Sequence, residues 1–229
     1  MNGARSLDAK RPGARAPAAR RASTFEPARP TRGDSAREAI LAAAERVFAR
    51  AGFNGATTAA IAEAAGVPKP NLHYHFGSKN ELYREVLSRT LHDWLVPMDG
   101  LEPEADPRAA LEAYIRAKMA MSAERPDASR VFANELLHGA PVLGEAMRSE
   151  LRAMVRRKAK VIDAWIASGR MANVDSTHLF FTIWAATQTY ADFDVQVRAV
   201  LGREEMSPRD HARASEHVVA LLLRGCGLA

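Results

Sequence analysis

The sequence is poor in cysteine and in long apolar runs. It contains one cysteine, Cys226, among 229 residues. A single cysteine excludes a disulfide framework and a cysteine-based zinc site, and it is typical of a reducing compartment. The longest apolar stretch, from Leu179 to Ala186, is too short to cross a bilayer. The basic N-terminal segment is not followed by the apolar run of a secretory signal. We therefore expect a cytoplasmic protein with no membrane partner.

Sequence motifs of catalysis are also missing. There is no Gly-x-Ser-x-Gly elbow, P-loop, His-Glu-x-x-His or dinucleotide-binding fingerprint. The seven histidines and the scattered acids form no constellation. His73 and His75, two positions apart on a helix, would point in nearly opposite directions. We therefore predict no enzyme activity, no catalytic residue, no cofactor and no metal site.

The positive charge is confined to the N-terminal end. The chain carries a net charge of +5, whereas residues 1–33 hold eight basic and two acidic residues, which gives this segment +6 and leaves −1 for the rest. The segment is rich in alanine, arginine and proline and has no apolar period. It cannot bury enough surface to offset its ordering entropy. We predict a disordered basic tail over 1–33, and the overall charge is by itself no evidence for nucleic-acid binding.

Helical periodicity begins at Ser35 and continues almost to the C-terminus. β-branched and aromatic residues never alternate with polar ones over a useful length, so no strand is expected and the fold class is all-α. Glycine and proline divide the chain into about nine helices. These are expected near 35–51, 58–65, 68–76, 79–96, 107–124, 127–137, 141–168, 175–201 and 208–224. We expect a three-helix N-terminal domain over 34–80 and a larger helical domain over 81–229.

Two short helices joined by a glycine turn lie inside the first of these domains. Small alanines allow the two helices to cross closely, and Gly66 can take the turn between them. Leu72 and Phe76 can hold the second helix on the core. A helix presented in this way can enter the major groove of DNA with its N-terminal residues at base edges. The candidates for its exposed face are Lys69, Pro70, Asn71, His73, Tyr74 and His75.

The segment from Thr57 to Leu82 resembles the signature of the TetR family of transcriptional repressors. The resemblance is densest at its end, which reads Leu72-His-Tyr-His-Phe-Gly-Ser-Lys-Asn-Glu-Leu82. It implies a ligand-responsive, nucleoid-associated repressor that binds double-stranded operator DNA as a homodimer. In this interpretation Lys69, Pro70 and Asn71 contact bases, and Thr58, Tyr74, His75 and Lys79 contact phosphates. Pro70 could offer only apolar contact, for example to a thymine methyl group.

Some of these residues have a plainer interpretation. Tyr74 could be a core aromatic with its hydroxyl at the surface, and Lys69 could be an ordinary solvated lysine. The basic tail could reach phosphates or the adjacent minor groove. It could also be an arginine-rich extension typical of a GC-rich genome, which is the interpretation that we favour.

The second domain carries a narrower resemblance, to regulators of pyrimidine utilisation within the same family. It rests on segments such as Tyr114-Ile-Arg-Ala-Lys118, Glu135-Leu-Leu-His-Gly-Ala-Pro141 and Trp184-Ala-Ala-Thr-Gln-Thr-Tyr-Ala-Asp-Phe193. The implied effector is uracil, thymine or a related pyrimidine, whose binding releases the protein from DNA. The implied targets are genes of pyrimidine or nitrogen metabolism.

The last of these segments supports a ligand site on its own chemistry. Trp184, Thr187 and Gln188 share one face of the helix expected over 175–201. A buried amide without a partner is costly. The carbonyl and NH₂ groups of Gln188 can pair with the imide edge of uracil, while Trp184 covers the flat ring. Four further side chains could close or line such a pocket: Tyr190, Phe193, Phe132 and Glu135.

Two alternatives remain open at this point. Gln188 could instead bond a neighbouring backbone group, or its symmetry mate at the dimer interface. The ligand could also be a different small aromatic or amide compound, or absent. The dimer interface itself is expected on the last two helices, whose small and apolar residues include Ala212, Ser215, Val218, Val219 and Leu222.

Deletion of residues 1–33 is expected to leave the sequence preference for the operator intact and to reduce only non-specific affinity. Contacts between basic side chains and phosphates add salt-dependent affinity but do not read bases. Anisotropy titrations of operator and random duplexes at several salt concentrations measure both quantities. If the truncated protein no longer distinguished the two duplexes, base reading would have to be assigned to the tail.

Overall fold

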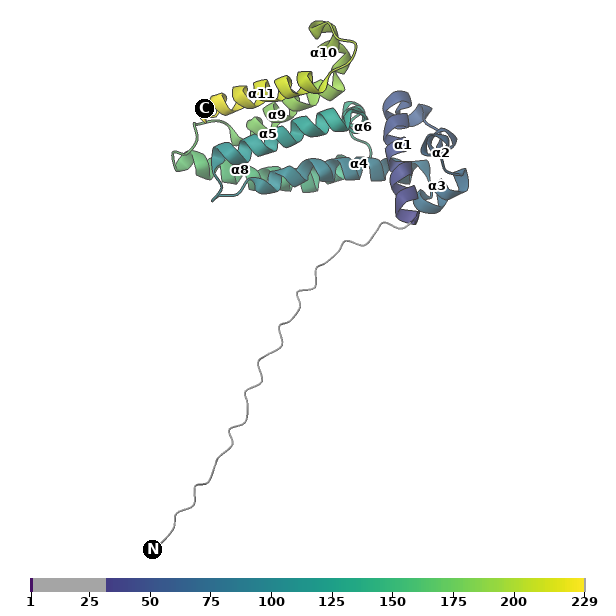
Figure 1. Cartoon of the computed structure of the whole chain (residues 1–229), viewed down its shortest axis with the longest axis horizontal. Helices are drawn as coiled ribbons and strands as arrows, with labels where there is room; N and C mark the ends of the chain where they lie inside the picture. The colour runs from purple at the N-terminus through teal and green to yellow at the C-terminus, as the bar shows by residue number, and fades with distance from the viewer. Residues whose placement is uncertain (2–31, 229) are drawn as a thin grey trace.

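The computed structural model describes residue 1 and residues 32–228, and every regular element in this part of the chain is a helix (Figure 1). The prediction of an all-α fold is confirmed. The predicted disordered tail lies almost entirely outside the described residues. Among the helices that the structure describes, none has the length and hydrophobicity that a membrane crossing requires.

The first four helices are α1 (Arg32–Gly55), α2 (Thr58–Ala65), α3 (Lys69–Phe76) and α4 (Lys79–Leu95). A short 3₁₀ helix, η1 (Val96–Gly100), leads to α5 (Pro107–Glu124) and α6 (Pro126–Leu137). The next segment contains the single turn α7 (Gly144–Ala146), the π-helical η2 (Met147–Leu151) and α8 (Arg152–Ala167). The chain ends with α9 (Ser176–Asp192), α10 (Asp194–Leu201) and α11 (Pro208–Gly225).

Local sequence signals set the boundaries of the N-terminal helices. The backbone leaves the helical region at Gly52 (φ 65°), near the end of α1, and Gly66 takes a left-handed conformation (φ 67°) after α2. Glycine adopts such angles without the steric penalty that a side chain would add. The Thr57 side chain caps α2 by accepting from the Ala60 amide, and Ser78 caps α4 through a reciprocal capping box.

Two groups of buried side chains organise the molecule. One group joins α1–α4 and includes Phe48 and Leu72 together with Phe132 from α6. The other lies among α5, α8, α9 and α11 and includes Trp165 and Phe180. Figure 1 shows α1–α3 at one end and the longer helices of the second group extending away from them. We call these two parts the head and the body.

Two helices of the body differ from the sequence-based expectation. The single helix expected over 175–201 is interrupted at Phe193 (φ −117°, ψ 33°), so α10 is separate from α9 and projects from the body (Figure 1). None of the residues of α10 is buried, so packing does not hold it in line with α9. The helix expected over 141–168 begins at Gly144 and contains the π-helical segment η2.

Three of the apolar residues of α11 that were predicted at the dimer interface face their own chain. Val218, Val219 and Leu222 are buried in the body, where α11 packs against α5. The prediction that these three side chains form the dimer interface is therefore wrong. Ala212 is exposed and Ser215 is half-buried, so both remain on the outer side of the helix.

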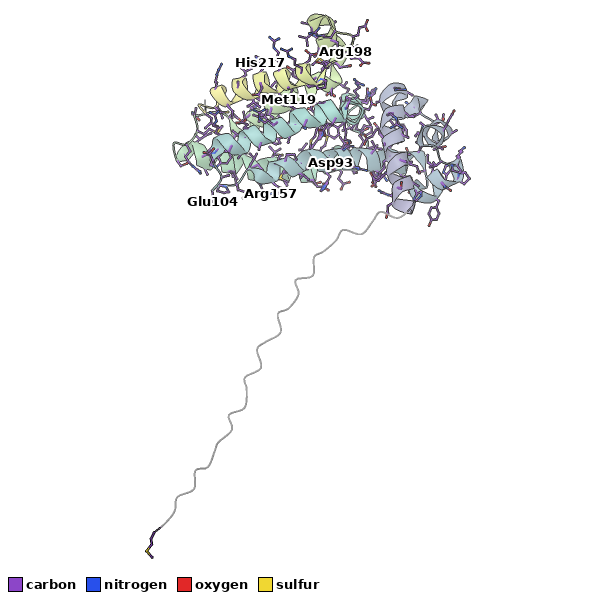
Figure 2. The ribbon with its side chains drawn as sticks, in the orientation of Figure 1. Asp93, Glu104, Met119, Arg157, Arg198 and His217 are labelled. Carbon is purple, nitrogen blue, oxygen red and sulfur yellow. The ribbon has the colours of Figure 1, made fainter. Side chains whose placement is uncertain are left out.

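Ion pairs connect the head to the body. Arg125, between α5 and α6, pairs with Glu45 of α1 and, at 2.5 Å, with Asp93 of α4. Figure 2 labels Asp93 on α4. Burial opposes the charge of this guanidinium group, but the two carboxylates outweigh it and raise the pKa of Arg125. Glu45 is 13% exposed, so solvent screens its pair less than it screens a surface pair.

We expect Arg125→Gln to lower the free energy of unfolding by about 1–3 kcal/mol, between the values typical of exposed and of buried ion pairs. Arg116→Gln is the matched control, because Arg116 also pairs with two carboxylates but one of them, Glu216, is 67% exposed, whereas Glu45 is 13% exposed. It should cost at most about 1 kcal/mol. Urea unfolding followed by circular dichroism measures both. Equal losses in the two variants would show that the ion pairs between head and body stabilise the fold no more than an exposed ion pair does.

Candidate DNA-binding and ligand-binding sites

Helix α3 presents one face to solvent at the end of the head. Leu72 and Phe76 fix the opposite face, with exposures of 0% and 7%. Tyr74 is 84% exposed, so the interpretation of Tyr74 as a core aromatic is wrong. The residues proposed to contact bases, Lys69, Pro70 and Asn71, are all exposed at the start of the helix. A start with two exposed polar side chains suits the approach of a recognition helix to a groove.

Two of the side chains predicted to contact phosphates are more buried than Lys69, Pro70 and Asn71. Thr58 is half-buried at the first position of α2. His75 is also half-buried, and its ring lies edge-on to Tyr74 with the centroids 5.2 Å apart. A nitrogen of the His73 ring lies 2.8 Å from the Gly77 carbonyl oxygen, which ties this side chain to the end of α3.

Lys79 has a structural role that the sequence did not reveal. Its ammonium group donates hydrogen bonds to the carbonyl oxygens of Phe53 (2.8 Å) and Ala56 (3.0 Å). It also lies 4.4 Å from the centroid of the Phe53 ring. These contacts hold the end of α1 against the start of α4. An ammonium group has three donors, so one remains for a phosphate, and that contact stays a prediction.

A small cavity of about 80 Å³ lies in the body between α4, η1, α5, α6, η2 and α9. Three of the predicted ligand-site residues line it together: Phe132, Trp184 and Gln188. Most of its remaining wall is apolar, formed by Leu91, Leu95, Met98, Leu136, Met147 and Leu151. An apolar wall with a few polar groups is typical of a small-molecule site.

The aromatic side chains of the cavity hold one another in place. Trp94 of α4 packs against Phe132 of α6 with ring centroids 4.6 Å apart. The Trp184 indole N–H donates to the Tyr114 hydroxyl at 2.7 Å, which fixes the plane of the indole. Gln188 is half-buried and makes no hydrogen bond with the described part of the chain. Its amide therefore has no neighbouring backbone partner there and is available to a ligand.

Lys118 of α5 is a cavity residue that sequence reasoning missed. The side chain is 2% exposed, and its ammonium group lies 3.8 Å from the centroid of the Trp94 ring. Burial lowers the pKa of Lys118 to about 7, against the opposing effect of the Asp192 charge. One signal was present in the sequence: Lys118 occupies a position in the apolar stripe of α5, one turn beyond Tyr114 and beside Met119.

Two residues that were predicted to bind the ligand form hydrogen bonds with the backbone of the protein instead. Thr187 is fully buried, and its hydroxyl donates to the Ile183 carbonyl at 2.8 Å. Glu135 is 3% exposed and accepts from the amides of Val142 (2.5 Å) and Leu143 (3.0 Å), which follow α6. Neither residue lines the cavity. The ligand-binding role predicted for both is corrected to a structural one.

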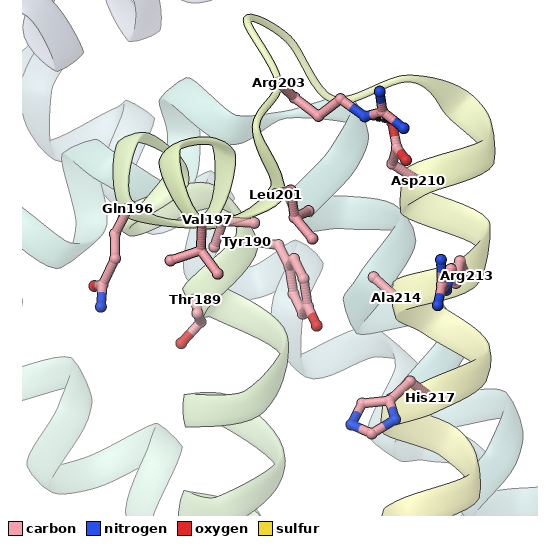
Figure 3. Close-up of a pocket in the computed structure, with 11 residues that line it drawn as sticks. Thr189, Tyr190, Gln196, Val197, Leu201, Arg203, Asp210, Arg213, Ala214 and His217 are labelled. Atoms are coloured by element: carbon pink, nitrogen blue, oxygen red, sulfur yellow. Dashed lines mark ion pairs between the residues drawn. The ribbon is translucent and has the colours of Figure 1, made fainter.

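Tyr190 and Phe193 also lie away from the cavity. Tyr190 points into an open groove of about 600 Å³ between α9, α10 and α11, where His217 lies nearby (Figure 3). Phe193 is 59% exposed at the break between α9 and α10. The prediction that these two side chains close the ligand site is wrong. Tyr190 lies six residues beyond Trp184, on another face of α9, and the position of Phe193 was predicted for an unbroken helix over 175–201.

A recognition helix on a small helical head, joined to a helical body that encloses a cavity, defines a ligand-responsive helix-turn-helix regulator. Residues 40–86 match the bacterial regulatory proteins of the tetR family, and residues 87–229 match the C-terminal region of the YcdC-like protein. The chain therefore belongs to the TetR family of transcriptional regulators. It is a DNA-binding protein and not an enzyme.

Individual relatives agree with this assignment. The HTH-type transcriptional regulator RutR of Escherichia coli K12 is 41% identical over 189 residues, which cover 82% of this chain and 89% of that protein. The repressor KstR2 of Rhodococcus jostii is 28% identical over 179 residues, 73% of this chain and 86% of the repressor. A tetR-family regulator from Rhodococcus RHA1 has a similar crystal structure, with a TM-score of 0.64 at 20% identity over 82% of this chain and 95% of the other. That last likeness shows the fold alone.

We expect Lys69→Ala and Tyr74→Ala each to weaken operator binding by about tenfold or more, because each removes an exposed side chain at the reading face. Arg157→Ala is the charge-matched control for Lys69→Ala. Arg157 is exposed on α8 in the body, away from the head (Figure 2). Anisotropy titrations with an operator duplex measure the effect. Equal losses in the Lys69 and Arg157 variants would show a general charge effect and not a contact by α3.

Proposed function

We propose that this protein is a repressor that leaves its operator when uracil, thymine or a close pyrimidine enters the cavity beside Trp184 and Gln188. Residues 34–80 would form the DNA-reading domain, and 81–229 the ligand-binding and dimerising domain. The segments quoted from the body resemble regulators of pyrimidine utilisation, which supports control of pyrimidine or nitrogen metabolism genes.

The observation that carries this proposal is the free amide of Gln188 beside a fixed indole, in a cavity whose only other charged or amide side chain among the described residues is Lys118. An amide offers a carbonyl acceptor beside an NH₂ donor. A cyclic imide presents an N–H beside a C=O, which is the complementary pair. Trp184 supplies the flat apolar surface that a planar ring covers. A cavity of about 80 Å³ is small beside the roughly 300–1,000 Å³ of typical ligand pockets, which favours a small ligand.

On the DNA side, the proposal keeps the contacts that the resemblance implies. Lys69, Pro70 and Asn71 would read bases from the exposed start of α3. Phosphate contacts are assigned to Thr58, Tyr74, His75 and Lys79. For Lys79, the structure limits this to the one ammonium donor that the carbonyls of α1 do not use.

The dimer interface is proposed on the outer faces of α9 and α11. Phe181 of α9 is 49% exposed and Leu221 of α11 is 60% exposed, and large apolar side chains of this exposure are typical of a surface that meets a partner. A dimer would also provide the two recognition helices that specific binding requires, since one recognition helix reads too few base pairs for a specific site.

Gln188→Leu tests the site, because leucine keeps most of the volume but removes the donor and the acceptor. Each ligand group left unpaired costs about 1–3 kcal/mol, so affinity for uracil should fall by one to several orders of magnitude. DNA binding should persist, and the variant should stay on its operator when uracil is added. Titration calorimetry measures the affinity, and anisotropy measures release.

Gln196→Leu is the matched control. Gln196 lies on α10 beside the open groove (Figure 3), so its loss should leave uracil affinity unchanged. Wild-type protein with no affinity for uracil or thymine would refute the pyrimidine assignment and favour a different small aromatic ligand. Full affinity in Gln188→Leu would refute the site while leaving the ligand in place.

A further inference from the structure

Lys118 brings an ammonium group to the wall of the proposed effector cavity. The walls contributed by α4 (Leu91, Trp94, Leu95) and by η2 (Met147, Leu151) carry no charge. On α9, the charged group that acts on Lys118 is Asp192. Its carboxylate accepts from the Ser129 hydroxyl of α6 at 2.5 Å and also interacts with the Arg130 charge. Among the described residues, no carboxylate lies within ion-pair distance of Lys118.

A second buried lysine shows what a purely structural ammonium group looks like in this protein. Lys158 of α8 is 8% exposed and donates to the Leu101 carbonyl at 3.1 Å and to the Glu102 carboxylate at 3.1 Å. It does not line the cavity. Lys118 makes no such bonds with the described residues, and its contact is the face of the Trp94 ring. A cation–π contact offsets only part of the cost of burying a cation.

Lys118 and Gln188 differ in the ligand groups with which they can form hydrogen bonds. A carboxamide presents both a donor and an acceptor, and a half-turn about its last bond exchanges them. Gln188 can therefore pair with a ring edge that carries a carbonyl group or with one that carries an amino group. An ammonium group only donates. An amino group facing it would leave two donors opposed in an apolar site, which costs free energy.

We propose that Lys118 determines the chemical class of the effector: it selects planar rings that present a carbonyl oxygen to it and rejects rings with an amino group at that position. This inference rests on the proposed function, since it assigns a specificity role within the same cavity. Keto pyrimidines such as uracil and thymine satisfy Lys118. Pyrimidin-4-one, which has one carbonyl group where uracil has two, cannot pair fully with Gln188 and also present a carbonyl oxygen to Lys118. Cytosine can do both, when its amino group and ring nitrogen face Gln188 and its remaining carbonyl oxygen faces Lys118.

The protonation state of Lys118 gives this selection a pH dependence. Burial lowers the pKa of Lys118 to about 7, with Asp192 opposing the shift. Below this pH the group is a donor-only ammonium and selection is strongest. Above it the neutral amine can also accept a hydrogen bond, so discrimination against an amino group weakens. A carbonyl ligand favours the ammonium form and raises this pKa, so uracil binding takes up a proton when the pH is above about 7.

The test compares uracil with pyrimidin-4-one in wild-type protein and in Lys118→Met by titration calorimetry at pH 6. Wild-type protein should prefer uracil by at least about tenfold, the cost of roughly one opposed or unpaired donor. Lys118→Met should bind uracil at least about tenfold more weakly and lose the preference. Lys158→Met is the matched control, because it also removes a buried ammonium group but should keep the preference.

A second measurement separates ligand contact from a structural role of Lys118. Uracil titrations of wild-type protein at pH 8, in two buffers with different ionisation enthalpies, should show proton uptake that Lys118→Met lacks. An unchanged uracil preference in Lys118→Met, or equal affinity of wild-type protein for both rings, would overturn this inference and leave the Gln188 site standing. No affinity of wild-type protein for uracil, thymine or pyrimidin-4-one would overturn both proposals.

Discussion

Helix α4 is packed at its two ends into different parts of the molecule. Near its start, Leu82 and Val86 are fully buried in the head against α1 and its neighbours. Near its end, Trp94 lines the cavity of the body. The helix is continuous from its capping box to Leu95, and close-packed cores do not absorb displacement gradually. Helix α4 therefore connects the wall of the cavity directly to the packed core of the head, and α3 immediately precedes it in the chain.

Helix α6 joins the two parts a second time. Phe132 belongs to the buried group of the head and also faces the cavity. One turn further, Glu135 accepts from the Tyr83 hydroxyl of α4 at 3.3 Å. With Arg125 bound to α1 and α4 at the start of α6, three contacts of different kinds tie this helix to the head. The cavity is thus bounded by the same helices that hold the DNA-reading unit.

The predictions that succeeded depended on short-range spacing. The turn between α2 and α3 is set by residues close together in sequence, and Trp184 and Gln188 share a face because they are one helical turn apart. Lys118 was missed because its burial depends on helices that are distant in the sequence, although its place in an apolar stripe was a signal. Phe193 was misplaced because neither glycine nor proline marks the break after α9. Val219 was misassigned because an apolar stripe looks the same whether it covers its own core or a partner.

The π-helical segment η2 contributes Met147 and Leu151 to the cavity wall. A π turn closes its hydrogen bonds over five residues instead of four and therefore holds one residue more than an α turn. Conversion of this turn to an α turn would rotate the side chains beyond it by about 100° relative to those before it. The positions of Met147 and Leu151 in the cavity wall therefore depend on the π geometry of this segment.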